Sequence, residues 1–298
     1  MIMSGSINRD DVRRNQHLLP AFPRTIERVL ATLDDPDANL NLLVSLIERD
    51  PALIGQILEQ ANSVAVRTRP DMRICNMFTA TSMIGLARIR RTVIATSMAG
   101  FLNDTLPPGL AGRFWEHSCA VGVCAQQLAI HCHHSGDMAL IAGMLHDVGQ
   151  LWLYRHEPDA FLAARDDCRI NGCRIEEAER RQFGVDHTLI GAWLAESWDL
   201  PGPLRNAILH HHKPEQAASE PLVAVTHIAE VLSAALGLNG DDSRVTHLST
   251  DACATLKLTW DESVTGLFGR IDAVSQSMAG FFRSQGPARR AENAVAGN

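Results

Sequence analysis

The sequence predicts an all-α protein, and three observations support this fold class. Apolar residues recur with the period of a helix, as in TIERVLATL, where Ile26, Val29, Leu30 and Leu33 follow the i, i+3, i+4, i+7 spacing. No segment alternates apolar and polar residues for long enough to indicate a strand, and the chain contains a single tyrosine. We therefore expect helices to supply the regular structure.

Helix starts and a linker divide the chain into parts. In ERDPALIGQILEQANS, Asp50 suits the N-cap of a helix and Pro51 suits its first turn. Further on, NDTLPPGLAGR places two prolines and two glycines between helical segments at 103–113, which is typical of a linker. We expect an N-terminal helical part packed on a second helical part. The predicted organisation is a flexible N-terminus over 1–18, a domain over 19–236 with parts at 19–112 and 113–236, a helical extension over 237–283 and a disordered tail over 284–298.

Composition and charge argue against several classes of protein. Acidic residues outnumber basic ones by 34 to 27, and the net charge of −7 disfavours indiscriminate binding to nucleic acid. The seven cysteines are scattered and form no C-x-x-C pair, so we expect neither a disulfide framework nor a cysteine metal site. The N-terminus lacks the apolar stretch of a secretory signal, and no apolar run reaches the roughly 18 residues of a membrane span. We therefore expect a cytoplasmic protein without a membrane partner.

One candidate ligand lies on the buried stripe of a predicted helix that begins near Phe114. His117 shares this stripe with Val121, Cys124 and Leu128. A lone histidine in such a place is commonly a hydrogen-bonded core residue. His117 becomes a candidate metal ligand only if other ligands lie close to it.

A histidine and an aspartate stand side by side at the end of an apolar helix. His146 and Asp147 close the segment LIAGMLHDVGQ, which we expect to end near Gly149 as a C-cap. A carboxylate in this setting is costly unless it is paired or bound to a cation. A structural ion pair and a metal site both fit the pattern.

More histidines follow at helix ends. His187 lies near the start of a helix in VDHTLIGAWL, and His210, His211 and His212 end the helix in NAILHHHKP. A histidine run also suits a solvated helix end. Imidazole and carboxylate are good ligands for first-row divalent metals, and two such metals can activate a water and hold a phosphate.

In this order and spacing, H…HD…H…HH…[D/E], the sequence resembles the HD superfamily of metal-dependent phosphohydrolases, and more closely its regulatory relative, the HDOD family. The resemblance extends from Leu19 to about residue 236. Four further stretches carry it, namely DPALIGQILEQANS, ATSMIGLARIRRTVIA, FWEHSCAVG and FGVDHTLIGAWLAESWDLP. The first 90 or so residues favour the HDOD family, because catalytic HD enzymes need no such segment.

The resemblance implies a set of metal ligands and a choice of cofactors. The implied ligands are His117, His146, Asp147, His187, His211, His212 and Glu230. Glu230 stands where aspartate is commoner in the family, and its longer side chain would have to reposition. The implied cofactor is one or two divalent ions of iron, manganese or zinc. A pocket that has lost its metal is the alternative interpretation. Asp147 is a catalytic residue only if the protein is an enzyme.

Two departures from the catalytic relatives concern phosphate chemistry. Where many of them carry lysine just after the HD pair, this chain has Gln150, and a neutral amide cannot stabilise phosphate charge in the same way. The D-G-x-G-Y-P element of the cyclic-dinucleotide phosphodiesterases is replaced by HHHKPEQAASEPL. Lys213 could supply a positive charge instead, although a solvated lysine after a helix end is the simpler interpretation.

These features leave three hypotheses of different kinds. The first is an all-α HDOD signalling module that relays a stimulus through contacts with other signalling proteins of a two-component or second-messenger pathway, without turnover. The second is a metal-dependent phosphohydrolase that acts on a nucleotide or a phosphodiester. The third and weakest is a DNA-binding protein, which rests only on the arginines of RIRR at 88–91. We expect a signalling protein as partner, a nucleotide or phosphate as candidate ligand, and no DNA.

Overall fold

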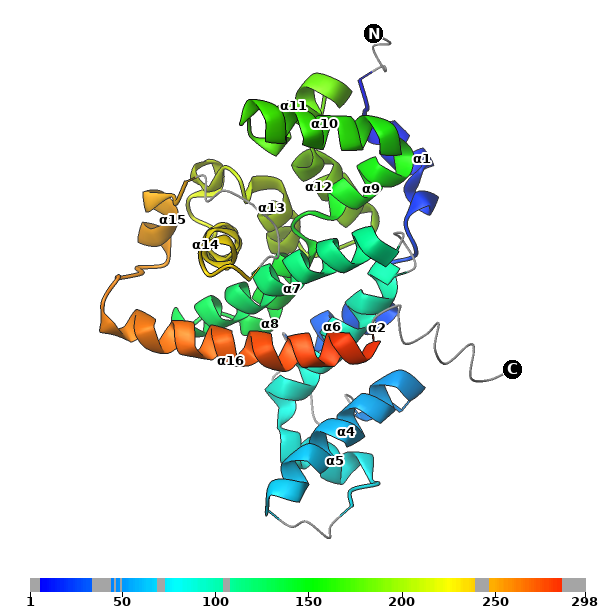
Figure 1. Ribbon diagram of the computed structural model, residues 1–298, viewed down its shortest axis with the longest axis vertical. Helices are drawn as coiled ribbons and strands as arrows, with labels where there is room; N and C mark the ends of the chain where they lie inside the picture. The colour runs from blue at the N-terminus through cyan, green and yellow to red at the C-terminus, as the bar shows by residue number, and fades with distance from the viewer. Residues whose placement is uncertain are drawn as a thin grey trace. The chain divides into compact units, whose positions relative to one another are not determined.

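The computed structural model of the chain is built from helices (Figure 1). It describes residues 6–33, 44–45, 47–48, 50–68, 73–103, 108–238 and 247–285. The regular structure in these ranges is helical throughout, which confirms the all-α prediction. The elements are α1 (Arg9–Arg14), η1 (Gln16–Leu18), α2 (Arg24–Leu33), α4 (Pro51–Thr68), α5 (Met77–Ile84), α6 (Leu86–Asn103), α7 (Pro108–His131), α8 (Gly136–Leu145), α9 (Val148–His156), α10 (Pro158–Asn171), α11 (Ile175–Phe183), α12 (His187–Ser197), α13 (Gly202–His210), η2 (Pro214–Ala217), α14 (Pro221–Ala235), α15 (Thr250–Thr255) and α16 (Glu262–Gln285).

The chain forms two compact units. Residues 22–101 make the smaller unit, and residues 1–21 together with 102–298 make the larger unit. Part of the predicted linker (104–107) and the predicted tail beyond residue 285 lie outside the described residues. None of the described helices combines the length and the apolar character that crossing a membrane requires.

In the larger unit, helices α7 and α8 cross with almost no side chain between them. A Cβ atom built on Gly143 of α8 would lie 2.7 Å from the Cα atom of Gly122 on α7, so only glycine fits at this crossing. His117 lies about one turn before Gly122, and His146 directly follows the end of α8. The close crossing therefore brings these two histidines toward each other.

The C-terminal helices complete the core of the larger unit. Leu256, at the end of α15, and Leu267 and Ile271, on α16, are buried in one cluster with apolar side chains of α7 and α14. Helix α16 runs alongside α7 (Figure 1). The segment after residue 247 is thus part of the bundle that carries the histidines.

Within the segment predicted to be flexible, residues 9–14 and 16–18 are helical. The side chain of Asn8 caps α1 by accepting hydrogen bonds from two main-chain N–H groups, and Val12 is buried. The indole Nε1–H of Trp152 donates to the carbonyl oxygen of Asn15 at 3.2 Å. The Asn8 cap, the burial of Val12 and the hydrogen bond from Trp152 therefore stabilise a segment whose composition alone suggests flexibility.

In the smaller unit, side-chain amides join segments that lie far apart in the sequence. Asn62 on α4 donates to the carbonyl oxygen of Ile74 at 2.9 Å and accepts from the N–H of Ile74 at 2.8 Å. The amide of Gln60 donates to the hydroxyl oxygen of Thr92 on α6 at 3.0 Å. The contacts of Asn62 provide partners for the buried backbone N–H and carbonyl of Ile74.

Candidate metal centre

Helix ends and two long helices bring the seven predicted ligands of the larger unit together. His146 and Asp147 form the junction between α8 and α9, His187 is the first residue of α12, and the two histidines after His210 follow the end of α13. His117 comes from α7 and Glu230 from α14. Residues far apart in the sequence therefore converge on one place, although their role as metal ligands stays a prediction.

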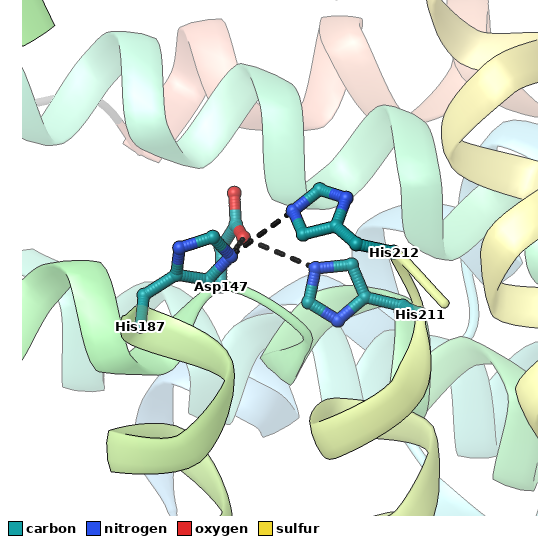
Figure 2. A group of neighbouring side chains, drawn as sticks. All are labelled: Asp147, His187, His211 and His212. Carbon is teal, nitrogen blue, oxygen red and sulfur yellow. Dashed lines mark hydrogen bonds and ion pairs between the residues drawn. The ribbon is translucent and has the colours of Figure 1, made fainter. Parts of the chain in front are cut away.

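The carboxylate of Asp147 lies between two sets of imidazoles. Its Oδ2 atom is 3.4 Å from Nε2 of His117 and 3.4 Å from Nε2 of His146. Its Oδ1 atom is 3.1 Å from Nε2 of His187 and 3.6 Å from Nε2 of His211. Figure 2 shows this second set gathered around one carboxylate oxygen. Asp147 would therefore serve as a carboxylate ligand shared by both sets of imidazoles.

Three imidazoles are held so that Nε2 faces the centre. The Nδ1 atoms of His146 and His211 each lie within hydrogen-bond distance of the main-chain carbonyl three residues earlier, at 2.7 and 2.8 Å. The Nδ1 atom of His187 lies 2.6 Å from Oε2 of Glu179, which also accepts the main-chain N–H of His187 at 2.8 Å. A carbonyl or carboxylate partner on Nδ1 requires a proton there, so Nε2 is the atom that can offer a lone pair to a metal. Burial acts to lower the pKa of His187, but the carboxylates of Glu179 and Asp147 outweigh it and hold this pKa well above its usual value, so a metal would have to displace the Nε2 proton of this ring.

Several nitrogen atoms lie at the spacing that ligands of one ion would have. The Nε2 atoms of His117 and His146 are 3.2 Å apart, and so are those of His187 and His212. Two ligand atoms about 2.1 Å from one ion, at an angle of about 90–110°, lie about 3.0–3.4 Å apart. Within the described part of the chain, the buried Nε2 atom of His211 has no hydrogen-bond partner. The residues present therefore fit a divalent metal.

Glu230 lies between the two sets. A carboxylate oxygen of Glu230 falls within 4.8 Å of ligand atoms of His146 and His211. Its Oε2 atom is 3.7 Å from Nδ1 of His212. Burial raises the pKa of this carboxyl above its usual value. The side chain is thus near both sets, and a bound cation would favour its ionised form.

Burial and charge set the protonation of the centre. Burial lowers the pKa of His146 to about 3, so this ring is neutral at pH 7. Burial acts to raise the pKa of Asp147, but the neighbouring His146 and His187 outweigh it and hold this pKa well below its usual value. A neutral imidazole and an ionised carboxylate are the forms that bind divalent metals.

Glu179 is a residue of the centre that sequence analysis missed. It is fully buried on α11, and its carboxylate holds the ring of His187. One signal was present, because Glu179 falls on the stripe formed by Ile175 and Phe183 at i−4 and i+4. A glutamate on an apolar stripe is expensive unless it has a partner.

The prediction that Gly149 is a C-cap is wrong, because it lies inside α9, which begins at Val148. A Cβ atom at this position would overlap the carbonyl oxygen of His187. The glycine is needed for close approach of α9 to α12. It thereby sets the distance between Asp147 and His187.

A cavity of about 370 Å³ opens beside the centre. It is lined by His212 on the side of the metal-type pocket, and by Arg180, His210 and Lys213 elsewhere. Arg180 forms an ion pair with Asp186. His210 thus lines the same cavity as the predicted ligand His212.

The model of one protein family matches this chain. The HDOD domain model covers residues 19–214, which is about two thirds of the sequence. The chain belongs to the HDOD family. An uncharacterized protein of Treponema pallidum (strain Nichols) is 26% identical over 220 residues, which are 72% of this HDOD chain and 42% of that protein. The chain thus spans less than half the length of this relative.

Solved structures share the fold at low identity. An HDOD domain protein of unknown function from Geobacter sulfurreducens has a TM-score of 0.72 at 20% identity, covering 89% of this chain and 95% of its own. A protein of Marinobacter aquaeolei VT8, provisionally named a signal transduction protein, has a TM-score of 0.67 at 21% identity, covering 92% and 66%. A protein of Shewanella amazonensis SB2B, provisionally named a phosphohydrolase, has a TM-score of 0.63 at 22% identity, covering 89% and 93%. At these identities the likeness shows the HD-type helical fold.

Proposed function

We propose that this HDOD chain is a signal-transduction module whose buried centre binds one or two divalent transition metals without turning over a substrate. Gln150 carries the proposal. It lies in the first turn of α9, where its N–H donates to the carbonyl oxygen of Asp147 at 2.9 Å. Catalytic relatives often place a lysine here, and an uncharged amide does not stabilise the charge that develops on a phosphoryl group.

The proposed role of the metals is to hold the helices of the larger unit together and to sense a small anionic ligand. The centre joins α7, α8, α12 and α14 with the turn after α13, so metal binding contributes directly to the folding of this unit. The output is contact with another signalling protein. The provisional name of the Marinobacter protein is consistent with such a role.

A second candidate function is a metal-dependent phosphohydrolase acting on a nucleotide or phosphodiester. The assembled donor set and the adjacent cavity lined by Lys213 favour it. A bound divalent ion would supply a water of lowered pKa and polarise a phosphoryl oxygen. In that case Asp147 and the histidines would hold the ions, and Lys213 would bind phosphate.

A hydrolysis screen separates the two functions. Nucleotides, cyclic dinucleotides and p-nitrophenyl phosphate would be incubated with the full chain and Mn²⁺, Fe²⁺ or Mg²⁺, beside His146→Ala and the surface control His134→Ala. We expect release of phosphate or nucleotide no faster than with His146→Ala. Turnover that His146→Ala abolishes and His134→Ala retains would overturn the proposed function in favour of the enzyme.

A further inference from the structure

His227 is a buried histidine of the larger unit whose two ring nitrogens are both used. It lies on α14, three residues before Glu230, and its relative exposure is 6%. Its Nδ1 atom is 2.7 Å from the carbonyl oxygen of His211. Its Nε2 atom is 3.1 Å from the main-chain nitrogen of Ser249.

The two partners of His227 determine where its proton lies. A main-chain carbonyl only accepts a hydrogen bond and a main-chain N–H only donates one. Nδ1–H must therefore donate to His211, while Nε2 accepts from Ser249. Burial lowers the pKa of His227, which agrees with a neutral ring. The ring thus forms a relay with a fixed direction, from the N–H of Ser249 to the carbonyl of His211.

One end of this relay is a main-chain group of the metal-type pocket. The ring of His211 is already held through Nδ1 by the carbonyl of Ile208 at 2.8 Å, and its Nε2 faces Asp147. The bond from His227 holds the main chain of the same residue. With its ring and its backbone both held, His211 cannot turn away from the centre without breaking one of these bonds.

The other end of the relay lies beyond the matched HDOD domain, which ends at residue 214. Ser249 is the N-cap of α15, and its hydroxyl accepts the N–H of Ala252 at 3.3 Å. Ala252 and Leu256 then enter the apolar core that α7 and α14 share. A segment with its own apolar anchoring is therefore hydrogen-bonded, through one imidazole, to the residue that precedes His212.

We propose that His227 is a positioning residue for the His211–His212 turn, and that its hydrogen bond to the carbonyl oxygen of His211 supports metal binding at that turn. This inference rests on the metal centre of the proposed function. His227 is not itself a ligand, because both of its nitrogens are occupied by main-chain groups. Its effect is to hold the imidazoles of His211 and His212 in the positions that a metal needs.

Two substitutions separate the halves of the relay. Asparagine places its amide nitrogen near the position of Nδ1, so His227→Asn keeps a donor for the carbonyl of His211. Glutamine reaches the position of Nε2, so His227→Gln keeps an acceptor for the N–H of Ser249 and loses the other bond. Ser249→Ala is a matched control, because it removes the α15 cap and retains the main-chain N–H.

Two readouts on the full chain test the proposal, namely Mn²⁺ binding to the chelator-stripped protein by calorimetry and hydrogen exchange of metal-free protein by mass spectrometry. We expect Mn²⁺ affinity to fall about 10-fold in His227→Gln and to stay within about threefold of wild type in His227→Asn and Ser249→Ala. In the metal-free protein, His227→Gln should speed exchange in the turn at 211–213, and His227→Asn should speed it at 249–252.

Equal Mn²⁺ affinities for the glutamine and asparagine variants would overturn the support that this hydrogen bond gives to metal binding. A wild-type chain that takes up no Mn²⁺ would count against the proposed metal centre, and hydrogen exchange would then decide the positioning role alone. Unchanged exchange at 211–213 in His227→Gln would refute that role, whether or not metal binds.

Discussion

The smaller unit buries amides and hydroxyls between its helices, whereas the larger unit buries histidines and carboxylates. None of the 13 histidines of the chain lies within residues 22–101. Buried polar side chains of the smaller unit include Gln56, Thr81 and Thr92, while the larger unit buries His146, Glu179 and others that can carry charge. Neutral polar groups satisfy one another in a core, but ionisable groups need a charged partner or a cation. The buried groups that could bind a cation therefore lie in the larger unit.

The largest expected effect is on Mn²⁺ affinity, when Asp147, the carboxylate shared by both sets of imidazoles, is replaced. Asp147→Ala should weaken Mn²⁺ binding by at least about 100-fold, since changes behind the ligands alone cost about 10- to 100-fold. Calorimetry on chelator-stripped protein measures this, with the exposed Asp159→Ala as control. Wild-type affinity in Asp147→Ala would show that the carboxylate is no ligand.

A matched pair of glycine substitutions should act in opposite directions in the two units. Gly149→Ala forces a Cβ into the carbonyl of His187 and should destabilise the chain by about 2–3 kcal/mol. Gly55→Ala, at an exposed position in the second turn of α4 with no atom of the described residues within 4 Å of the new Cβ, should stabilise by about 0.5–1 kcal/mol. Denaturant unfolding gives both values. Equal tolerance at both positions would contradict the close approach of α9 to α12.

A substitution in the smaller unit tests whether metal binding depends on the larger unit alone. Asn62→Ala leaves the N–H and carbonyl of Ile74 without their side-chain partner and should cost about 1–3 kcal/mol of stability. Hydrogen exchange should rise around Ile74, while Mn²⁺ affinity stays that of wild type; exposed Glu59→Ala is the control. A loss of Mn²⁺ affinity in Asn62→Ala would show that the metal chemistry is not confined to the larger unit.

A smaller effect on Mn²⁺ binding than that of Asp147→Ala is expected from the charge behind His187. Glu179→Gln keeps an acceptor for Nδ1 but removes the negative charge, and should weaken Mn²⁺ binding about 10-fold. Glu177→Gln, exposed on the same helix, should have no effect. If the two variants bind Mn²⁺ equally well, the negative charge of Glu179 does not support metal binding.

The sequence indicated which side chains cluster where the residue type has a high free-energy cost of burial. Asp147 after a run of apolar residues, and His187 at a helix start, stand out because neither suits a core without a partner. Their order, compared with the HDOD pattern, led to the side chains that the structure brings together.

The parts that sequence reasoning missed depend on how helices pack. His227 meets partners 16 and 22 residues away along the chain, and no local period predicts either contact. Gly149 resembles a C-cap by its place after the HD pair, but its role is set by α12 passing against it. Residues 9–18 look loose in composition, yet Trp152 binds them from 137 positions away.

The proposed function of this HDOD chain requires a divalent metal bound in the larger unit. The metal content of freshly purified protein, measured by plasma mass spectrometry beside His146→Ala, tests this requirement most directly. We expect iron, manganese or zinc at one or two equivalents per chain in the wild type and loss of that metal in the variant. A folded wild-type protein without metal, which takes up none when iron, manganese and zinc are supplied, would contradict this expectation.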